Sequence, residues 1–177
     1  FNLSCNDNFI IVSSYIGSKL EQRFGNTAFI YQKVEGIWDH KPVLNITGYT
    51  DKAWFGSRVQ ISDSYAAVIA AQGFDSNGAQ TTFIFKRNAT SGKWDDPNHV
   101  QSIYQGGAWQ LSLSQHYLLI GGSNEVAVYE LGNNPTKPWS LVKTLTGSSS
   151  ISISPLFSFI LLVDHGVYLF GTDIHFH

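Results

Sequence analysis

The sequence has little charge and lacks the features of nucleic-acid-binding and membrane-spanning chains. Only 14% of its 177 residues are charged, and 11 Lys and Arg against 13 Asp and Glu leave a formal net charge of -2. Because no basic patch is present, we expect no nucleic-acid partner. The longest apolar run, Phe157 to Val163, is too short to cross a bilayer, so we expect no membrane span in this segment.

Methionine is absent, and cysteine occurs once, at Cys5. A single cysteine excludes a disulfide within these residues, so Cys5 either pairs outside them or is a free thiol. The chain opens on Phe1 with neither an initiator nor a signal-like apolar segment. We therefore expect a piece of a longer or processed polypeptide.

Sustained helical periodicity is also absent, and only Lys19 to Phe24 has room for one helical turn. Instead, four short apolar runs recur along the chain, each beginning with an aromatic residue. These runs are Phe9–Val12, Tyr65–Ile69, Tyr117–Ile120 and Phe159–Val163. Their first residues are 56, 52 and 42 positions apart, a spacing in the range of propeller blades.

A second run of alternating aromatic residues follows each first run, and a tryptophan follows in three units. The second runs are Phe29–Tyr31, Phe83–Phe85, Val126–Tyr129 and Val167–Phe170, and the tryptophans are Trp38, Trp94 and Trp139. Such runs, separated by Gly, Asn, Asp and Ser clusters, are typical of strands. A continuous apolar run indicates a strand that is buried on both faces. We predict an all-β chain, a partial β-propeller of about three to four four-stranded antiparallel blades.

The predicted blades divide the chain into four parts. They are a blade lacking its first strand at 1–54, a blade at 55–109, a blade at 110–150 and an incomplete blade at 151–177. Pairs of small residues end the first three inner runs and are expected to let neighbouring backbones converge; they are Ser13-Ser14, Ala70-Ala71 and Gly121-Gly122. Because propellers close with roughly four to eight blades, this is about half a ring with open apolar faces. We expect the parent chain or another copy to supply the remaining blades.

The second unit combines several features that occur together in one known type of repeat. They are Phe55-Gly56 ahead of Val59–Ser62, the run Ala67–Ala71, the loop Phe74–Gly78, the run Phe83–Phe85 and Trp94. In this combination the unit resembles an FG-GAP repeat, the blade of integrin-alpha-type β-propellers. The other units match by pattern alone, with Trp109-Gln110 in place of the Phe-Gly pair before the third unit.

The resemblance implies a calcium site, because integrin-type blades often hold calcium in an Asp-rich hairpin between their second and third strands. The segment Asp75-Ser76-Asn77-Gly78 stands where that loop is expected. Asp75 and Asn77 offer side-chain oxygens, whereas calcium takes about six to eight ligands. Asn77-Gly78 is also a favourable hairpin turn. A calcium site and a simple turn both remain open interpretations.

Motifs for catalysis are missing, and we expect no enzymatic activity. The sequence has no Gly-x-Ser-x-Gly and no glycine-rich phosphate loop. His165, His175 and His177 gather near the end, but a metal site needs more ligands held in geometry. Trp54 and Trp109, each just before an expected first strand, are the candidates for a binding face, whereas packing accounts for most other aromatic residues.

Three N-x-[ST] sequons, at Asn2, Asn45 and Asn88, indicate N-glycosylation. Asn88 follows an apolar run and precedes Ser91-Gly92, as a surface turn does. We expect an extracellular or cell-surface glycoprotein module with a structural, adhesive or protein-interaction role and a protein or glycan ligand. Two alternatives stay open: a secreted propeller lectin or glycan-acting enzyme with a loop-built site, and a subunit of a surface filament whose copies pair their open edges.

Overall fold

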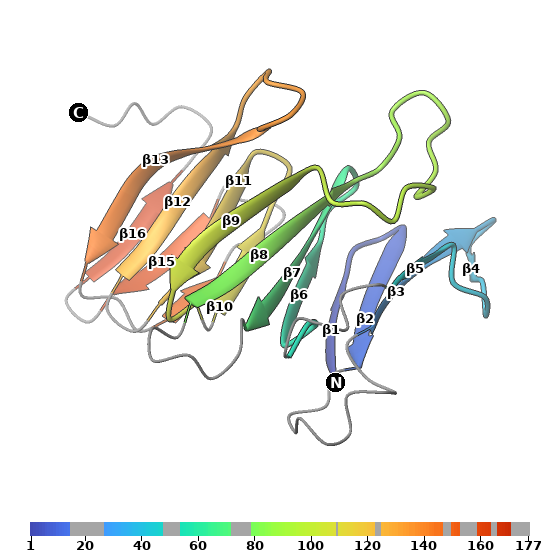
Figure 1. Cartoon of the computed structure of the whole chain (residues 1–177), viewed down its shortest axis with the longest axis horizontal. Helices are drawn as coiled ribbons and strands as arrows, with labels where there is room; N and C mark the ends of the chain where they lie inside the picture. The colour runs from blue at the N-terminus through green and yellow to red at the C-terminus, as the bar shows by residue number, and fades with distance from the viewer. Residues whose placement is uncertain are drawn as a thin grey trace. The chain divides into compact units, whose positions relative to one another are not determined.

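The described part of the chain consists of antiparallel β-sheets and contains no helix (Figure 1). A computed structural model describes residues 1–14, 27–47, 54–71, 79–108, 110–122, 125–146, 150–152, 159–163 and 166–170. The all-β prediction is therefore confirmed, while the helical turn expected within 19–24 lies outside the described residues. No helix in these ranges is long and apolar enough to span a membrane. The chain divides into two compact units, Phe1–Gly106 and Gly107–His177.

The first unit contains two sheets in which successive strands pair. The first sheet contains β1 (Asn2–Cys5), β2 (Phe9–Ser14) and β3 (Thr27–Val34), and β3 also pairs with β4 (Ile37–Trp38) and β5 (Leu44–Ile46). The second sheet has the order β6 (Arg58–Ile61), β7 (Tyr65–Ala71), β8 (Ala79–Lys86) and β9 (Gln101–Gly106). β1 lies beside β6, so equivalent strands of the two sheets are neighbours (Figure 1).

β1 corrects the prediction that the first unit lacks its first strand. Its sequence has neither β-branched nor aromatic residues, so propensity gives no strand signal. Contacts with neighbouring strands hold these residues in an extended strand instead. All four residues pair with β2, and the backbone amides of Val59 and Ile61 donate to Asn2 Oδ1 at 3.0 Å and to Ser4 Oγ at 3.2 Å.

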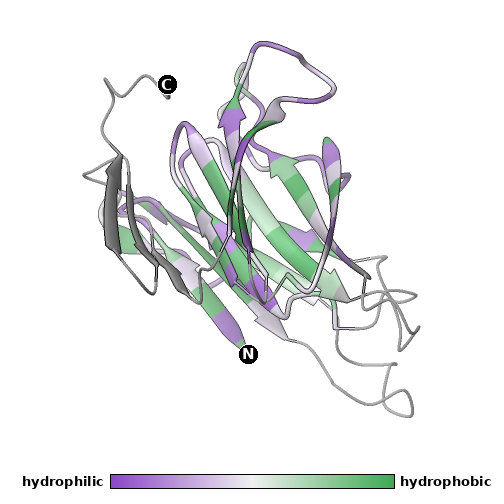
Figure 2. Cartoon of the chain, turned by 90° about the vertical axis from the view of Figure 1, so that its left-hand side faces the viewer, coloured by the Kyte–Doolittle hydropathy of each residue, from purple (hydrophilic) through white to green (hydrophobic). Residues whose placement is uncertain are grey.

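The second unit also contains two meanders. One has the order β10 (Gln110–Leu113), β11 (Tyr117–Gly121), β12 (Glu125–Leu131) and β13 (Trp139–Thr146). The other has the order β14 (Ser150–Ser152), β15 (Phe159–Val163) and β16 (Gly166–Phe170). The four predicted inner runs lie within β2, β7, β11 and β15. Hydrophobic residues are concentrated on the strands, whereas the loops are largely hydrophilic (Figure 2).

One turn geometry recurs between the first and second strands of three sheets. The turns run from Asn6 to Phe9, from Ser62 to Tyr65 and from Ser114 to Tyr117. In each, the aromatic residue's amide donates to the first residue's side-chain oxygen, at 2.8, 3.1 and 3.0 Å. The first residue's amide donates back to the aromatic residue's carbonyl oxygen, at 3.0, 2.8 and 2.8 Å. The repeat in sequence is thus also a repeat in backbone geometry.

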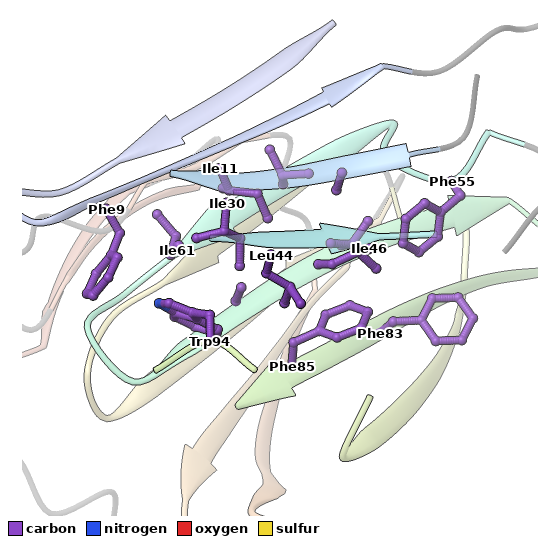
Figure 3. Packing of buried hydrophobic residues seen from close by; sticks show 14 of the residues in the cluster. Phe9, Ile11, Ile30, Leu44, Ile46, Phe55, Ile61, Phe83, Phe85 and Trp94 are labelled. Atoms are coloured by element: carbon purple, nitrogen blue, oxygen red, sulfur yellow. The ribbon is translucent and has the colours of Figure 1, made fainter. Parts of the chain in front are cut away.

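The core of the first unit lies between its two sheets. Phe9, Ile11 and Ile30 of the first sheet lie against aromatic residues of the second, including Phe85 (Figure 3). Trp94, from the loop between β8 and β9, enters the same cluster and meets the Phe9 ring edge-on at 5.8 Å. Residues 65–70 of β7 are buried without interruption, which confirms a second strand buried on both faces. In β2, by contrast, buried and half-buried residues alternate.

The Phe-Gly pair before β6 has two structural reasons. Phe55 is fully buried, with its ring centre 5.9 Å from that of Phe83. Gly56 has a φ of 89°, and a Cβ there would lie 2.7 Å from the Cβ of Ser13. Ser13 Oγ donates a 2.6 Å hydrogen bond to the Gly56 carbonyl oxygen. The small residue at the end of β2 therefore allows the close backbone approach that the small pairs predict.

We predict that Gly56→Ala destabilises the fold far more than Gly36→Ala. Gly36 has a similar φ of 81°, but a Cβ there would have no neighbour within 4 Å. Gly36→Ala should lower the free energy of unfolding by about 1 kcal/mol through backbone strain alone. Gly56→Ala adds the collision with Ser13 and should lower it by about 3 kcal/mol, measured by urea denaturation. Equal losses would show that the contact with Ser13 is unimportant.

A second prediction concerns His99, whose ring lies 5.0 Å from the Phe83 ring and 6.5 Å from the Phe85 ring. Partial burial against these rings lowers the pKa of His99, although the residue as a whole remains exposed, so the effect on stability is small. The unfolded chain therefore takes up the proton first as the pH falls below about 6.5, and stability decreases in that range. His99→Gln should reduce the loss of stability between about pH 7.5 and about pH 5.5, measured by urea denaturation. The unmodified chain, measured in the same way, is the control.

Candidate functional site: the outer face of the first sheet

The side chains of the first sheet alternate between two faces. One face joins the core with the second sheet, and we call the opposite one the outer face. By register, seven residues of the outer face are Leu3, Cys5, Ile10, Val12, Phe29, Tyr31 and Trp38, and Ser14, Thr27, Lys33 and Asn45 lie on the same face. Most of these side chains are apolar, yet none of them is fully buried. Among the described residues, this largely apolar sheet face has no cover, which is unusual for a sheet.

Each of the first seven residues of the outer face has an equivalent in the second unit of the repeat. Strand register assigns six of them, and Trp94 is taken as the equivalent of Trp38 because it follows 56 residues later. In the same order, the equivalents are Val59, Ile61, Ala66, Val68, Phe83, Phe85 and Trp94, and all are buried. Leu3 is 60% exposed, whereas Val59 is 1% exposed. Trp38 is 38% exposed, whereas Trp94 is 2% exposed. The outer face therefore has the composition of a core face, and no described residue of the chain covers it.

The cover of the equivalent face in the second sheet is the inner face of the first sheet. That face presents Phe9, Ile11 and Ile30 from the middle of the sheet, with Leu44 and Ile46 from β5 (Figure 3). The two faces that meet are thus of different kinds. We call the inner face the Phe9-type face and the face equivalent to the outer face the Val12-type face. In the first unit, the Phe9-type face of the first sheet packs on the Val12-type face of the second sheet, head to tail.

Two cationic residues, Lys33 and Arg87, lie at equivalent positions beside the outer face and its equivalent in the second sheet. The amides of Lys33 and Arg87 donate to the equivalent carbonyl oxygens of Asn8 and Ser64, at 2.8 and 2.9 Å. The Arg87 guanidinium lies 5.2 Å from the centre of the Phe9 ring, across the packed sheets. The Lys33 ammonium lies 5.5 Å from the Trp38 ring of its own sheet. Each contact is a cation–π interaction.

The three sequons have different surroundings. Asn45 is exposed on β5, opposite Phe29 in register, at the margin of the outer face. Asn88 is exposed in a turn, where its Oδ1 accepts hydrogen bonds from the amides of Thr90 and Ser91 at 2.9 and 3.1 Å. Asn2 is half-buried and accepts the hydrogen bond from the β6 amide described above. Asn45 and Asn88 are therefore the accessible acceptors.

The other predicted site residues are only partly described. Trp54 is half-buried in the turn before β6 with a φ of 57°, and its carbonyl oxygen accepts a hydrogen bond from the Ser57 amide at 2.9 Å. Trp109, Asp75, Asn77 and the three histidines near the end lie outside the described residues, so the calcium site stays a prediction. Within the described ranges, no group of three or more His, Cys, Asp and Glu side chains fits a metal ion. Cys5 is an exposed free thiol.

Comparisons with known proteins add little to this geometry. No protein-family model and no curated protein matches the chain. A solved structure described as "KlHsv2 with loop 6CD replaced by a Gly-Ser linker" matches 82% of this chain at 12% sequence identity, with a TM-score of 0.42. The match spans 38% of that chain, so the present chain covers well under half of its length. A likeness at this level carries no argument about fold or function.

We predict that the two equivalent tryptophans differ sharply in their contribution to stability. Trp94→Ala removes a buried ring from the core and should lower the free energy of unfolding by about 3 kcal/mol or more. Trp38→Ala removes a ring from the uncovered outer face and should cost about 1 kcal/mol or less. Urea denaturation of the two variants at low protein concentration provides the comparison. Similar losses would contradict the view that the outer face lacks a cover.

Proposed function

We propose that the chain is a module of a β-propeller, with about three to four blades of four strands, from an extracellular or cell-surface glycoprotein. Its role is structural, adhesive or in protein interaction, and it involves no catalysis. The observation that carries the proposal is the outer face of the first sheet. That face is built like a buried face one repeat later, so it is suited to bind another surface rather than water.

The propeller part of the proposal is supported by the repeat. Meanders of four strands, an inner strand buried on both faces and one recurring turn are what successive blades require. The Phe55-Gly56 pair, which motivated the likeness to an FG-GAP repeat, lies where the first two sheets approach each other closely. In a propeller such a position requires a residue without a side chain.

The extracellular part of the proposal rests on the sequons. Asn88 lies in an exposed turn, and Asn45 is the exposed residue of β5 between the buried Leu44 and Ile46. The equivalent of Asn45 is Ser102, which stays half-exposed although its sheet is covered on that face. A glycan on Asn45 is therefore compatible with a covered outer face.

We predict that natively sourced protein carries N-glycans on Asn45 and Asn88. Peptide mass spectrometry should detect the glycan mass at both positions, and enzymatic release should convert both asparagines to aspartates. A sample analysed without enzymatic release is the control for spontaneous deamidation. Unmodified asparagine at both positions throughout native material would overturn the extracellular assignment.

A further inference from the structure

We infer that the outer face of the first sheet binds the last sheet, β14–β16, of a second copy of this chain. Copies would then associate head to tail through the same kind of packing that joins the first two sheets. The inference rests on the repeat architecture of the proposed function and adds to it the surface and the partner.

The chemistry of the missing cover follows from the one such interface that the first unit contains. There, the buried set equivalent to the outer face is covered by Phe9, Ile11 and Ile30, which belong to a sheet of the same repeat. A surface that covers Val12 and Phe29 should accordingly resemble the face that presents Phe9, Ile11 and Ile30. A partner of the same repeat type reproduces this fit, whereas a polar partner would find a single charged side chain, Lys33, on the described outer face.

The chain carries a second set of residues at Phe9-type register positions. In the last sheet, Phe159 and Leu161 of β15 pair with Phe170 and Tyr168 of β16, as Phe9 and Ile11 of β2 pair with Gln32 and Ile30 of β3. By sequence, these four positions of the last sheet are all apolar. One chain thus contains both halves of a head-to-tail interface. This is the condition for a heterologous association that closes into a ring or continues as a filament.

The cation beside the outer face supports the same partner. Arg87 lies over Phe9 of the sheet that covers it, at 5.2 Å from the ring centre. Lys33 is the equivalent of Arg87, and Phe159 is the equivalent of Phe9. In the proposed complex, Lys33 would therefore lie beside the start of β15 of the second copy.

Cys5 reports on the interface in the unmodified chain, because it is exposed on the outer face while its equivalent, Ile61, is buried. We expect iodoacetamide to alkylate Cys5 readily at about 1 µM protein and about tenfold more slowly at about 100 µM, where sedimentation velocity should detect larger species. Equal reactivity with a monomer throughout would overturn the inference. Protection in a monomer at every concentration would also overturn it, because the cover would then belong to the same chain.

A mixing experiment tests the head-to-tail geometry. Val12→Lys should disable the outer face and Leu161→Lys the last sheet, each weakening association by about 100-fold because a charge is buried without a partner. A mixture of the two variants should form a one-to-one dimer and nothing larger, since each variant keeps one intact face. Val34→Lys, at an exposed position of the same sheet outside the outer face, should associate like the wild type. Circular dichroism checks that the variants fold, and Cys5 protection in the unmodified chain remains decisive if Leu161→Lys does not.

Two results would contradict this geometry: undiminished association of Val12→Lys, or a mixture that stays monomeric although both variants fold. These outcomes are separate from those of the glycan analysis. Unmodified asparagines with intact association would remove the extracellular role and leave the interface in place. Glycosylated protein that does not associate would keep the extracellular role and remove the interface.

Discussion

The contact between Ser13 and Gly56 is the constraint on which the packing of the first unit depends. At this point the end of β2 approaches the backbone ahead of β6 so closely that a single methyl group would collide. The close approach brings the two sheets within reach of each other's side chains, so that Phe9, Phe85 and Trp94 form one cluster. Burial of this apolar surface is the main favourable contribution to the stability of the unit.

The two faces of each sheet differ, and this asymmetry has a physical consequence. When a Phe9-type face packs only on a Val12-type face, each added repeat covers one face and presents another of the same kind. A linear series of such sheets therefore always leaves an apolar face at its end. Covering the end with a polar surface, closing the series into a ring or joining further copies are the ways to remove it. The exposed Leu3 and Trp38 show that no part of the chain that the structure describes covers this end of the series.

The recurring turn explains how sheets with different sequences keep one geometry. Asn or Ser at the first position provides a side-chain oxygen for the amide of the following aromatic residue, and Asn6, Ser62 and Ser114 all do so. This local hydrogen bond fixes where the inner strand begins, independently of which apolar residues follow. The register of the aromatic residue, and with it the assignment of side chains to faces, is then the same in each repeat.

The sequence alone determined the inner strands and the antiparallel order of the strands, because burial on both faces leaves a continuous apolar run such as Ala66–Ala70. It did not reveal β1, whose order comes from pairing with β2 and from hydrogen bonds to β6 rather than from its own residues. Nor did it distinguish Trp38 from Trp94, which occupy the same place in the repeat. Only the tertiary structure decided which of them is buried, because burial depends on whether another sheet lies against the ring, and periodicity carries no information about that neighbour.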